Sequence, residues 1–272
     1  MSAGSPDLAQ LKSHMKAAWM AGDFGQIANY SQIAAEEFVA RIAIPRGARV
    51  LDVACGTGNT AIPAAKAGAA VTGIDIAPNL LEQARQRASA ENLQITFQEG
   101  DAEQIPHPDG SFDMVLTMFG AMFAPRPPFV AAELLRVCRP GGVIAMANWT
   151  PQGFVGKTFQ LTAKMVPPPP GVLPPVLWGD EDTVRQRFAK GLASLTLTRQ
   201  RIPFKYPFPP KDVVAFFRQY FGPTQMSFNR LDANGQAALT EQLEALWNEH
   251  NRAKDGTTNV EVEYLEVRAI RA

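Results

Sequence analysis

The stretch VLDVACGTGN, residues 50–59, is an apolar run that leads directly into a glycine turn. The residues after the turn, as far as Lys66, are compatible with a helix. Glycines let a backbone come close to a ligand, and the free amides at a helix start favour hydrogen-bond acceptors. The stretch therefore predicts a ligand-binding strand, turn and helix. Residues 56–61, GTGNTA, also satisfy the loose G-x-G-x-x-G/A pattern of NAD-binding proteins, so this stretch alone leaves the ligand open.

Apolar runs and helix-compatible segments alternate around this unit. Strands are expected at residues 50–54, 70–76, 95–98, 112–118, 143–148 and 195–206, and later helices at 154–166 and 181–192. Because the first five runs are apolar throughout, we expect an α/β fold whose parallel sheet is covered by helices on both faces. A last strand is expected at residues 260–270, where the alternation changes phase at Tyr264 and Leu265. A bulge there, or burial on both faces, would account for the change.

A large part of the chain lies outside this pattern. Residues 1–45 contain amphipathic helical runs and are expected to form an N-terminal helical cap on a main domain of residues 46–272. Within the main domain, residues 154–192 and 207–257 are expected as inserted helical lid segments. The chain has 22 prolines, and the segment PPPPGVLPP, residues 167–175, favours an extended path. Eleven of the prolines lie within residues 151–210, directly after the fifth strand, and we expect this cluster to form a stiff rim over the ligand site.

Three acidic residues stand at or near the ends of the expected strands. Asp75 ends the second strand, where its carboxylate is placed to accept both hydroxyls of an adenosine ribose while Ile76 lies on the adenine. Asp52 lies inside the first strand, and a buried aspartate needs partners such as a ligand ammonium or an amide network. Asp101 follows the third strand, where it could accept from an adenine amino group while Ala102 offers its backbone amide. A solvated turn aspartate is the simpler alternative for Asp75.

Four motifs follow one another in order between residues 49 and 150. Besides the glycine turn and the acids, the fourth strand begins with Phe112-Asp113, and Arg139-Pro-Gly-Gly142 leads into the fifth. In order and spacing the chain resembles the class I S-adenosylmethionine-dependent methyltransferases, in the group similar to ubiquinone/menaquinone-biosynthesis methyltransferases. The resemblance implies a Rossmann-like, doubly wound, mostly parallel seven-stranded sheet with an antiparallel last strand. It also implies S-adenosylmethionine as cofactor and S-adenosylhomocysteine as product.

The resemblance assigns cofactor-binding roles to positions that match the family's motifs. These positions are Asp52, Ala54, Gly56, Thr57, Gly58, Asp75, Ile76, Asp101, Ala102, Thr117 and Met118. The glycine turn is expected to hold the methionine part of the cofactor, and the end of the fourth strand to border the methyl group. One departure is visible, because family members often carry glycine where this chain has Ala54 and Cys55. Small side chains are tolerated there, so the cofactor prediction stands.

Methyl transfer is an in-line displacement at a sulfonium carbon, so it needs neither a protein nucleophile nor a metal. The expected activity is therefore that of a methyltransferase of EC class 2.1.1 with no metal site. A general base would help an acceptor that must lose a proton. Tyr30, in the helical cap, is the best-placed candidate, with core packing as the competing interpretation. His14, His107 and His250 are interpreted as surface or packing residues.

Aromatic residues after the strands are expected to form the walls of the acceptor site. The candidates are Phe119, Phe123, Trp149 and Phe154. Such walls suit an apolar or a cationic small-molecule acceptor. Two other classes of function stay open, namely an NAD-dependent oxidoreductase and a non-catalytic cofactor-binding protein of the methyltransferase fold.

Composition argues against several other partners. With 26 basic and 26 acidic residues the formal net charge is zero, so there is no basic footprint for nucleic acid. The fourth strand ends in TMFG, residues 117–120, rather than in the Asn/Asp-Pro-Pro-aromatic motif of nucleic-acid methylating relatives. No membrane span is expected, and the two cysteines agree with a reducing, cytoplasmic setting. The oligomeric state is open, a homodimer included.

Overall fold

A seven-stranded sheet in the order β3-β2-β1-β4-β5-β7-β6 runs through the molecule. The computed structural model describes residues 7–272. The strands are β1 (Arg49–Val53), β2 (Ala70–Asp75), β3 (Ile95–Glu99), β4 (Phe112–Met118), β5 (Cys138–Trp149), β6 (Leu192–Tyr206) and β7 (Thr258–Arg271). Strands β1 to β5 are parallel, and β7 runs antiparallel to both β5 and β6. The predicted doubly wound α/β sheet with an antiparallel last strand is confirmed.

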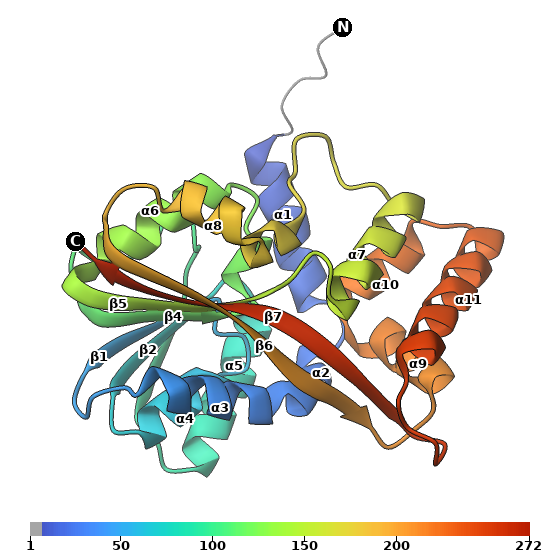
Figure 1. Cartoon of the computed structure of the whole chain (residues 1–272), viewed down its shortest axis with the longest axis horizontal. Coiled ribbons are helices and arrows are strands. Elements are labelled where there is room, and N and C mark those ends of the chain that lie inside the picture. The colour runs from blue at the N-terminus through green and yellow to red at the C-terminus, as the bar shows by residue number, and fades with distance from the viewer. Residues whose placement is uncertain (1–6) are drawn as a thin grey trace, which may run out of the picture.

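Helices cover both faces of the sheet (Figure 1). One face carries α3 (Gln32–Ile42), α4 (Ala61–Lys66) and α5 (Pro78–Ala90), and the other carries α6 (Pro127–Val137) and α8 (Glu181–Arg187). Central strand residues such as Leu51 and Val115 are therefore completely buried. Burial on both faces explains why these strands are apolar throughout rather than alternating.

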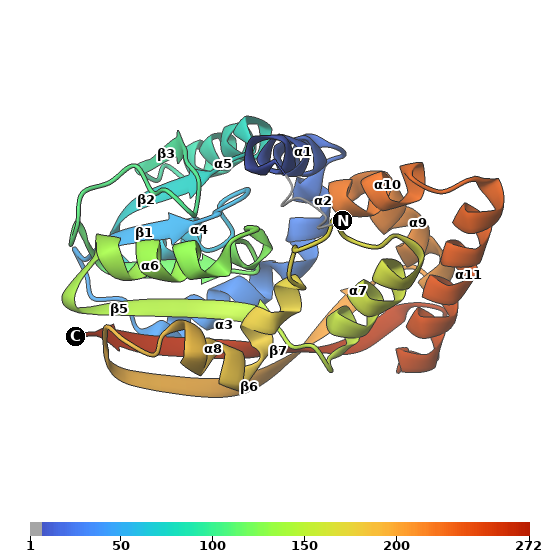
Figure 2. The same ribbon diagram turned by 90° about the horizontal axis from the view of Figure 1, so that it is seen from above.

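The remaining helices gather at one end of the sheet, beyond the carboxyl ends of the parallel strands (Figure 2). They are α1 (Leu8–Met20), α2 (Phe24–Ala28), α7 (Phe154–Met165), α9 (Pro210–Tyr220), α10 (Gly222–Asn229) and α11 (Ala233–His250), with short 3₁₀ turns at Asn29–Ser31, Ala121–Phe123 and Pro175–Gly179. The first six residues of the expected cap lie outside the described residues. No helix within residues 7–272 has the length and apolar character to cross a membrane.

Some element boundaries differ from the sequence-based expectation. The helix expected at residues 181–192 ends at Arg187, because the chain turns at Gly191 with φ of 89° and enters β6 at once. Strand β5 begins at Cys138 rather than Val143, with an irregular register against β4. Tyr264 and Leu265 are both buried, while the pairing of β7 with β5 and β6 is uninterrupted there. Burial on both faces, and not a bulge, therefore explains the change of phase.

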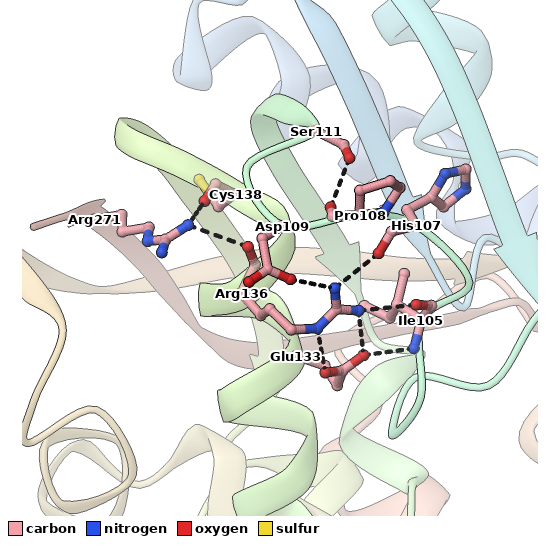
Figure 3. A network of polar contacts seen from close by, with 9 residues as sticks. All are labelled: Ile105, His107, Pro108, Asp109, Ser111, Glu133, Arg136, Cys138 and Arg271. Atoms are coloured by element: carbon pink, nitrogen blue, oxygen red, sulfur yellow. Dashed lines mark hydrogen bonds and ion pairs between the residues drawn. The ribbon is translucent and has the colours of Figure 1, made fainter.

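One arginine anchors the loop between β3 and β4 (Figure 3). The Arg136 guanidinium, on α6, donates through Nε and Nη2 to Glu133 at 2.7 and 2.8 Å and through Nη1 to Asp109 at 2.8 Å. It also donates to the carbonyl oxygens of Ile105 and His107 at 2.9 and 2.8 Å. The hydrogen bonds from Arg136 lower the pKa of Glu133. This network fixes the chain just after Asp101, one of the predicted site residues.

We expect Arg136→Lys to lower the free energy of unfolding by about 1–3 kcal/mol, because one ammonium cannot reach two carbonyls and two carboxylates at once. Urea denaturation measures the change. Arg139→Lys is the matched control, since Arg139 contacts Asp113 and the Pro140 carbonyl on the exposed surface. The control should shift the free energy by less than about 0.5 kcal/mol. Equal losses in the two variants would contradict an anchoring role for Arg136.

Candidate functional site

Two adjoining cavities lie at the carboxyl ends of the parallel strands. The larger has a volume of about 710 Å³ and is lined by α1, α2 and the ends of β1 to β4. The smaller, about 150 Å³, lies between the end of β4, the helical cap and the helices that follow β5. Both cavities are lined by Trp19, Phe24, Ser31, Phe119 and Phe123. Ligands bound in the two cavities would therefore meet at this shared wall.

The glycine turn forms one side of the larger cavity in a backbone conformation that L-residues rarely adopt. Ala54, Gly56 and Gly58 have φ values of 55°, 53° and 84°. Glycine adopts such values freely, whereas alanine does so at a cost of about 1–2 kcal/mol. The left-handed φ of Ala54 gives a physical reason for the glycine that family members often carry at this position. The turn also contacts the chain just after β4. A Cβ on Gly120 would lie 2.4 Å from the Ala54 carbonyl oxygen, so only glycine allows this close approach.

A second strained residue faces the turn across the site. Phe119, immediately after β4, has φ of 58°. Its ring lies flat on that of Trp149, with centroids 3.5 Å apart and planes 8° from parallel. Phe119 also lines both cavities. Strain of this kind persists only where packing holds it, and it gathers at ligand sites.

Asp75 ties the end of β2 to the glycine turn. Its Oδ2 accepts from the backbone N–H of Gly56 at 2.9 Å, and its Oδ1 accepts from that of Ala77 at 2.9 Å. The side chain is only 7% exposed, and burial raises its pKa while these hydrogen bonds lower it. Each carboxylate oxygen keeps a further lone pair. Since Asp75 and Ile76 both line the larger cavity, the carboxylate is available to ligand hydroxyls.

Asp52 stands behind the turn rather than in the cavity lining. It is 1% exposed, and its Oδ2 has no hydrogen-bond partner among the described residues. Burial raises the pKa of Asp52 well above its usual range, the backbone N–H of Ala61 lowers it, and the neighbouring Asp75 carboxylate raises it. Gly58 and Thr117 also lie outside the lining of the larger cavity. The Thr117 hydroxyl oxygen accepts from the N–H of Ala121 at 3.1 Å, which braces the chain after β4.

The other predicted cofactor positions line the larger cavity. These are Ala54, Gly56, Thr57, Asp75, Ile76, Asp101, Ala102 and Met118. Asp101 is already engaged, because its Oδ1 accepts from the N–H of Glu103 at 2.8 Å and its Oδ2 pairs with Lys12. The Lys12 ammonium also lies 2.6 Å from Glu103, whose side chain is fully buried. Another lysine of α1, Lys16, pairs with Glu99.

Helix α1 is thus held across the larger cavity by ion pairs, by one aromatic ring, and by close packing of its last turn on the start of α10, where a Cβ on Gly222 would lie 1.8 Å from the Ala18 carbonyl oxygen. None of its residues is buried. Trp19 meets Phe24 and Phe123 edge-on at centroid distances of 5.7 and 5.1 Å. Sequence reasoning missed Lys12, Lys16 and Trp19. Their spacing of four and three residues places them on one helix face, and this was the available signal.

The smaller cavity is lined chiefly by aromatic rings. All four predicted wall residues, Phe119, Phe123, Trp149 and Phe154, line it, as does Tyr30. Sequence reasoning missed other members of the lining, namely Phe159, Phe204, Tyr206, Phe221 and Trp247. Within residues 7–272 the lining of this cavity includes no charged residue and no histidine.

The proline segment does not form the expected rim. No residue of 167–175, and no other proline of residues 151–210, belongs to the described lining of either cavity. Prolines 167 to 170 are exposed, and the segment leads from α7 to the 3₁₀ turn at Pro175–Gly179. The expectation was wrong: aromatic side chains of α2, α7, α9 and α11, and not prolines, line the smaller cavity.

Comparison with known proteins identifies the class. A family described as a methyltransferase domain matches residues 50–142. The uncharacterized protein Rv1403c of Mycobacterium tuberculosis is 37% identical over 235 residues, which cover 83% of this chain and 83% of that protein. The chain belongs to the class I S-adenosylmethionine-dependent methyltransferases, and its cofactor is S-adenosylmethionine.

The chain has two further similarities. The demethylmenaquinone methyltransferase of Deinococcus radiodurans is 41% identical over 129 residues, 46% of this chain and 54% of that protein. The crystal structure of the YcgJ protein of Bacillus subtilis superposes with a TM-score of 0.60 at 18% identity and covers 86% of this chain and 98% of that one. The latter likeness shows the shared fold. Family membership also favours S-adenosylmethionine over NAD, which the glycine pattern alone left open.

We expect Asp52→Asn to make the protein without cofactor more stable at pH 8 than the wild type, by about 1 kcal/mol or more, because it removes a buried carboxylate with an unpartnered oxygen. The gain should be smaller at pH 5. Folded Asp52 keeps its proton to a higher pH than unfolded Asp52, so wild-type stability falls as pH rises from about 4 through the raised pKa. Asparagine does not titrate, so the Asp52→Asn variant lacks this fall in stability with rising pH.

Urea denaturation of both proteins at the two pH values measures the difference, in which titrating groups that do not interact with Asp52 cancel. A stability difference that is the same at pH 5 and pH 8 would show that Asp52 is not held in the raised-pKa environment described above.

Proposed function

We propose that the protein transfers the methyl group of S-adenosylmethionine to a small, mostly apolar molecule bound in the aromatic cavity. The shared wall of the two cavities carries this proposal, because Trp19, Phe24, Ser31, Phe119 and Phe123 contact both spaces. In-line displacement needs the acceptor atom directly behind the methyl carbon. Two cavities that share one wall support such an arrangement.

The larger cavity fits the cofactor's chemistry residue by residue. Asp75 would accept from the ribose hydroxyls, with Ile76 beside the adenine, and the glycine turn at Gly56 and Thr57 would hold the methionine part, next to Ala54. Asp101 and Ala102 would recognise the edge of the adenine, and Met118 would border the methyl group. Asp52, Gly58 and Thr117 would act from behind the lining, and the unpartnered Oδ2 of Asp52 would complete a network toward the cofactor ammonium.

The chain's own contribution is orientation and exclusion of water. The bound cofactor supplies an electrophilic methyl group, so no protein nucleophile is required. The aromatic lining keeps water from competing with the acceptor, because it offers water few hydrogen-bonding partners. We propose α1 and α2 as the cap and α7 and α9 to α11 as the lid of this compartment, whereas α3 and α8, also expected in these segments, pack on the faces of the sheet. Both cysteines are free and buried, which supports a reducing, cytoplasmic setting.

Asp75→Ala should weaken binding of S-adenosylhomocysteine by about 1.5–3 kcal/mol, the scale of hydrogen bonds to a charged group. Isothermal titration calorimetry measures the loss. Asp75→Asn keeps one acceptor oxygen and should lose less, which separates a ribose contact from a general effect on the turn. Wild-type affinity in Asp75→Ala would mean that the cofactor lies elsewhere.

Thr158→Trp should abolish methyl transfer while leaving S-adenosylhomocysteine affinity unchanged. Thr158, on α7, lines the smaller cavity and not the larger one, so a bulky ring there would fill the acceptor space. Transfer of labelled methyl to a panel of small apolar amines, thiols, phenols and quinols is the readout, with a loss of at least about tenfold expected. Thr196→Trp, on the exposed edge strand β6, is the matched control. Normal transfer by Thr158→Trp, or no transfer by the wild type to any panel member, would contradict the proposal.

A further inference from the structure

The glycine turn is held from two sides by groups of opposite charge. On one side the Asp75 carboxylate accepts from the N–H of Gly56. On the other side the Arg87 guanidinium, in the last turn of α5, donates through Nη1 to the Thr57 carbonyl oxygen at 2.7 Å and to the Thr57 hydroxyl oxygen at 3.1 Å. Hydrogen bonds from charged groups are stronger than those between neutral groups. The two residues therefore fix the backbone of the turn, one from the end of β2 and the other from α5.

Asn59 extends the contact of Arg87 to the helical cap. Its Oδ1 accepts from Arg87 Nη1 at 2.6 Å, and its Nδ2 donates to the Ala28 carbonyl oxygen at 2.8 Å and to the Ser31 hydroxyl oxygen at 3.4 Å. A guanidinium only donates and a carbonyl oxygen only accepts, so these partners determine which way the amide is oriented. Arg87 thus orients the side chain that joins the turn to the cap.

Arg87 is the last of three polar residues on one face of α5. Asn79, Gln83 and Arg87 follow one another at intervals of four residues. Asn79 donates to the Met20 carbonyl oxygen at 3.4 Å, and Gln83 donates to the Asp23 carboxylate at 3.0 Å, both in the cap. This face of α5 is therefore directed toward the cap and the glycine turn.

Packing alone does not account for a charged residue at this place. Arg87 is half-buried, and burial lowers its pKa, while the charge of Glu91 raises it to a smaller extent. Removing a guanidinium from water costs free energy unless its hydrogen bonds are made. Those that Arg87 makes within residues 7–272 all go to Thr57 and Asn59.

The two partners of Arg87 line the larger cavity, whereas Arg87 belongs to the described lining of neither cavity. An effect of Arg87 on a ligand therefore acts through Thr57 and Asn59. Resting on the proposed function, we propose that Arg87 is a positioning residue for the methionine part of the cofactor. It holds the turn and Asn59 in the arrangement that receives this part, whereas Asp75 acts on the ribose. The two residues thus affect different halves of one ligand.

The test compares two ligands that share the adenosine half: S-adenosylhomocysteine and 5′-methylthioadenosine, which lacks the ammonium and carboxylate of the methionine part. Isothermal titration calorimetry measures both affinities. We expect Arg87→Met to weaken S-adenosylhomocysteine binding at least about fivefold and to change 5′-methylthioadenosine binding less than about twofold. Arg87→Lys keeps a charged donor and should recover part of the loss. Asp75→Ala should weaken both ligands, because both carry the ribose.

Arg85→Met is the matched control, since it removes the same charge from the same helix. Arg85 donates to the Phe97 carbonyl oxygen at 3.0 Å and pairs with Glu82, away from the glycine turn. This variant should bind both ligands as the wild type does. Unchanged 5′-methylthioadenosine binding in Arg87→Met also reports a folded protein with an intact adenosine site.

The outcomes separate this inference from the proposed function. If the wild type binds S-adenosylhomocysteine no more tightly than 5′-methylthioadenosine, the turn does not hold the methionine part, and the proposed cofactor placement falls together with the inference. If Arg87→Met weakens both ligands equally, Arg87 only stabilises the fold and the inference alone is overturned. It is also overturned if Arg87→Met keeps wild-type affinity for S-adenosylhomocysteine, or if Arg85→Met loses as much.

Discussion

The carboxylate of Asp75 is the interaction on which the arrangement of the site depends. It accepts from Gly56 on one side and from Ala77 on the other, so it joins the turn after β1 to the turn after β2. This bridge helps to hold the left-handed turn at Ala54, which Gly120 approaches closely from the end of β4. A single buried acid thus sets the shape of the cavity that it also lines.

The two halves of the site are stabilised by different forces. The sheet side is held by fully buried strands and by networks such as that of Arg136, and the backbone there is fixed from several directions. Helix α1 on the opposite side has no buried residue and is held by the ion pairs of Lys12 and Lys16 and the ring of Trp19. Interactions between partly exposed charges are modest and screened by salt. We therefore expect the larger cavity to open more readily on the α1 side than on the sheet side.

The sequence was most informative where local patterns carry the structure. Apolar runs predicted the parallel strands. The glycine turn with Asp75 is a local motif, and its geometry follows from the types of residue in it. Contacts across long separations were not accessible in this way, which is why the pairing of Lys12 with Asp101 and the place of Tyr206 in the cavity were missed. Strand positions alone also could not show that Asp52 lies behind the cavity lining. That distinction depends on how the turn folds over the strand end.

The long pair of strands β6 and β7 has a consequence for how such proteins diversify. The two strands run past the end of the parallel sheet (Figure 1). The helices that follow or precede them supply much of the lining of the smaller cavity. The cofactor turn and its acids lie in another part of the chain, within residues 50–142. Substitutions in the helices can therefore accumulate without disturbing the methyl donor site. The glycine turn and its acids fix the larger cavity, whereas the shape of the smaller cavity can change with the side chains of these helices.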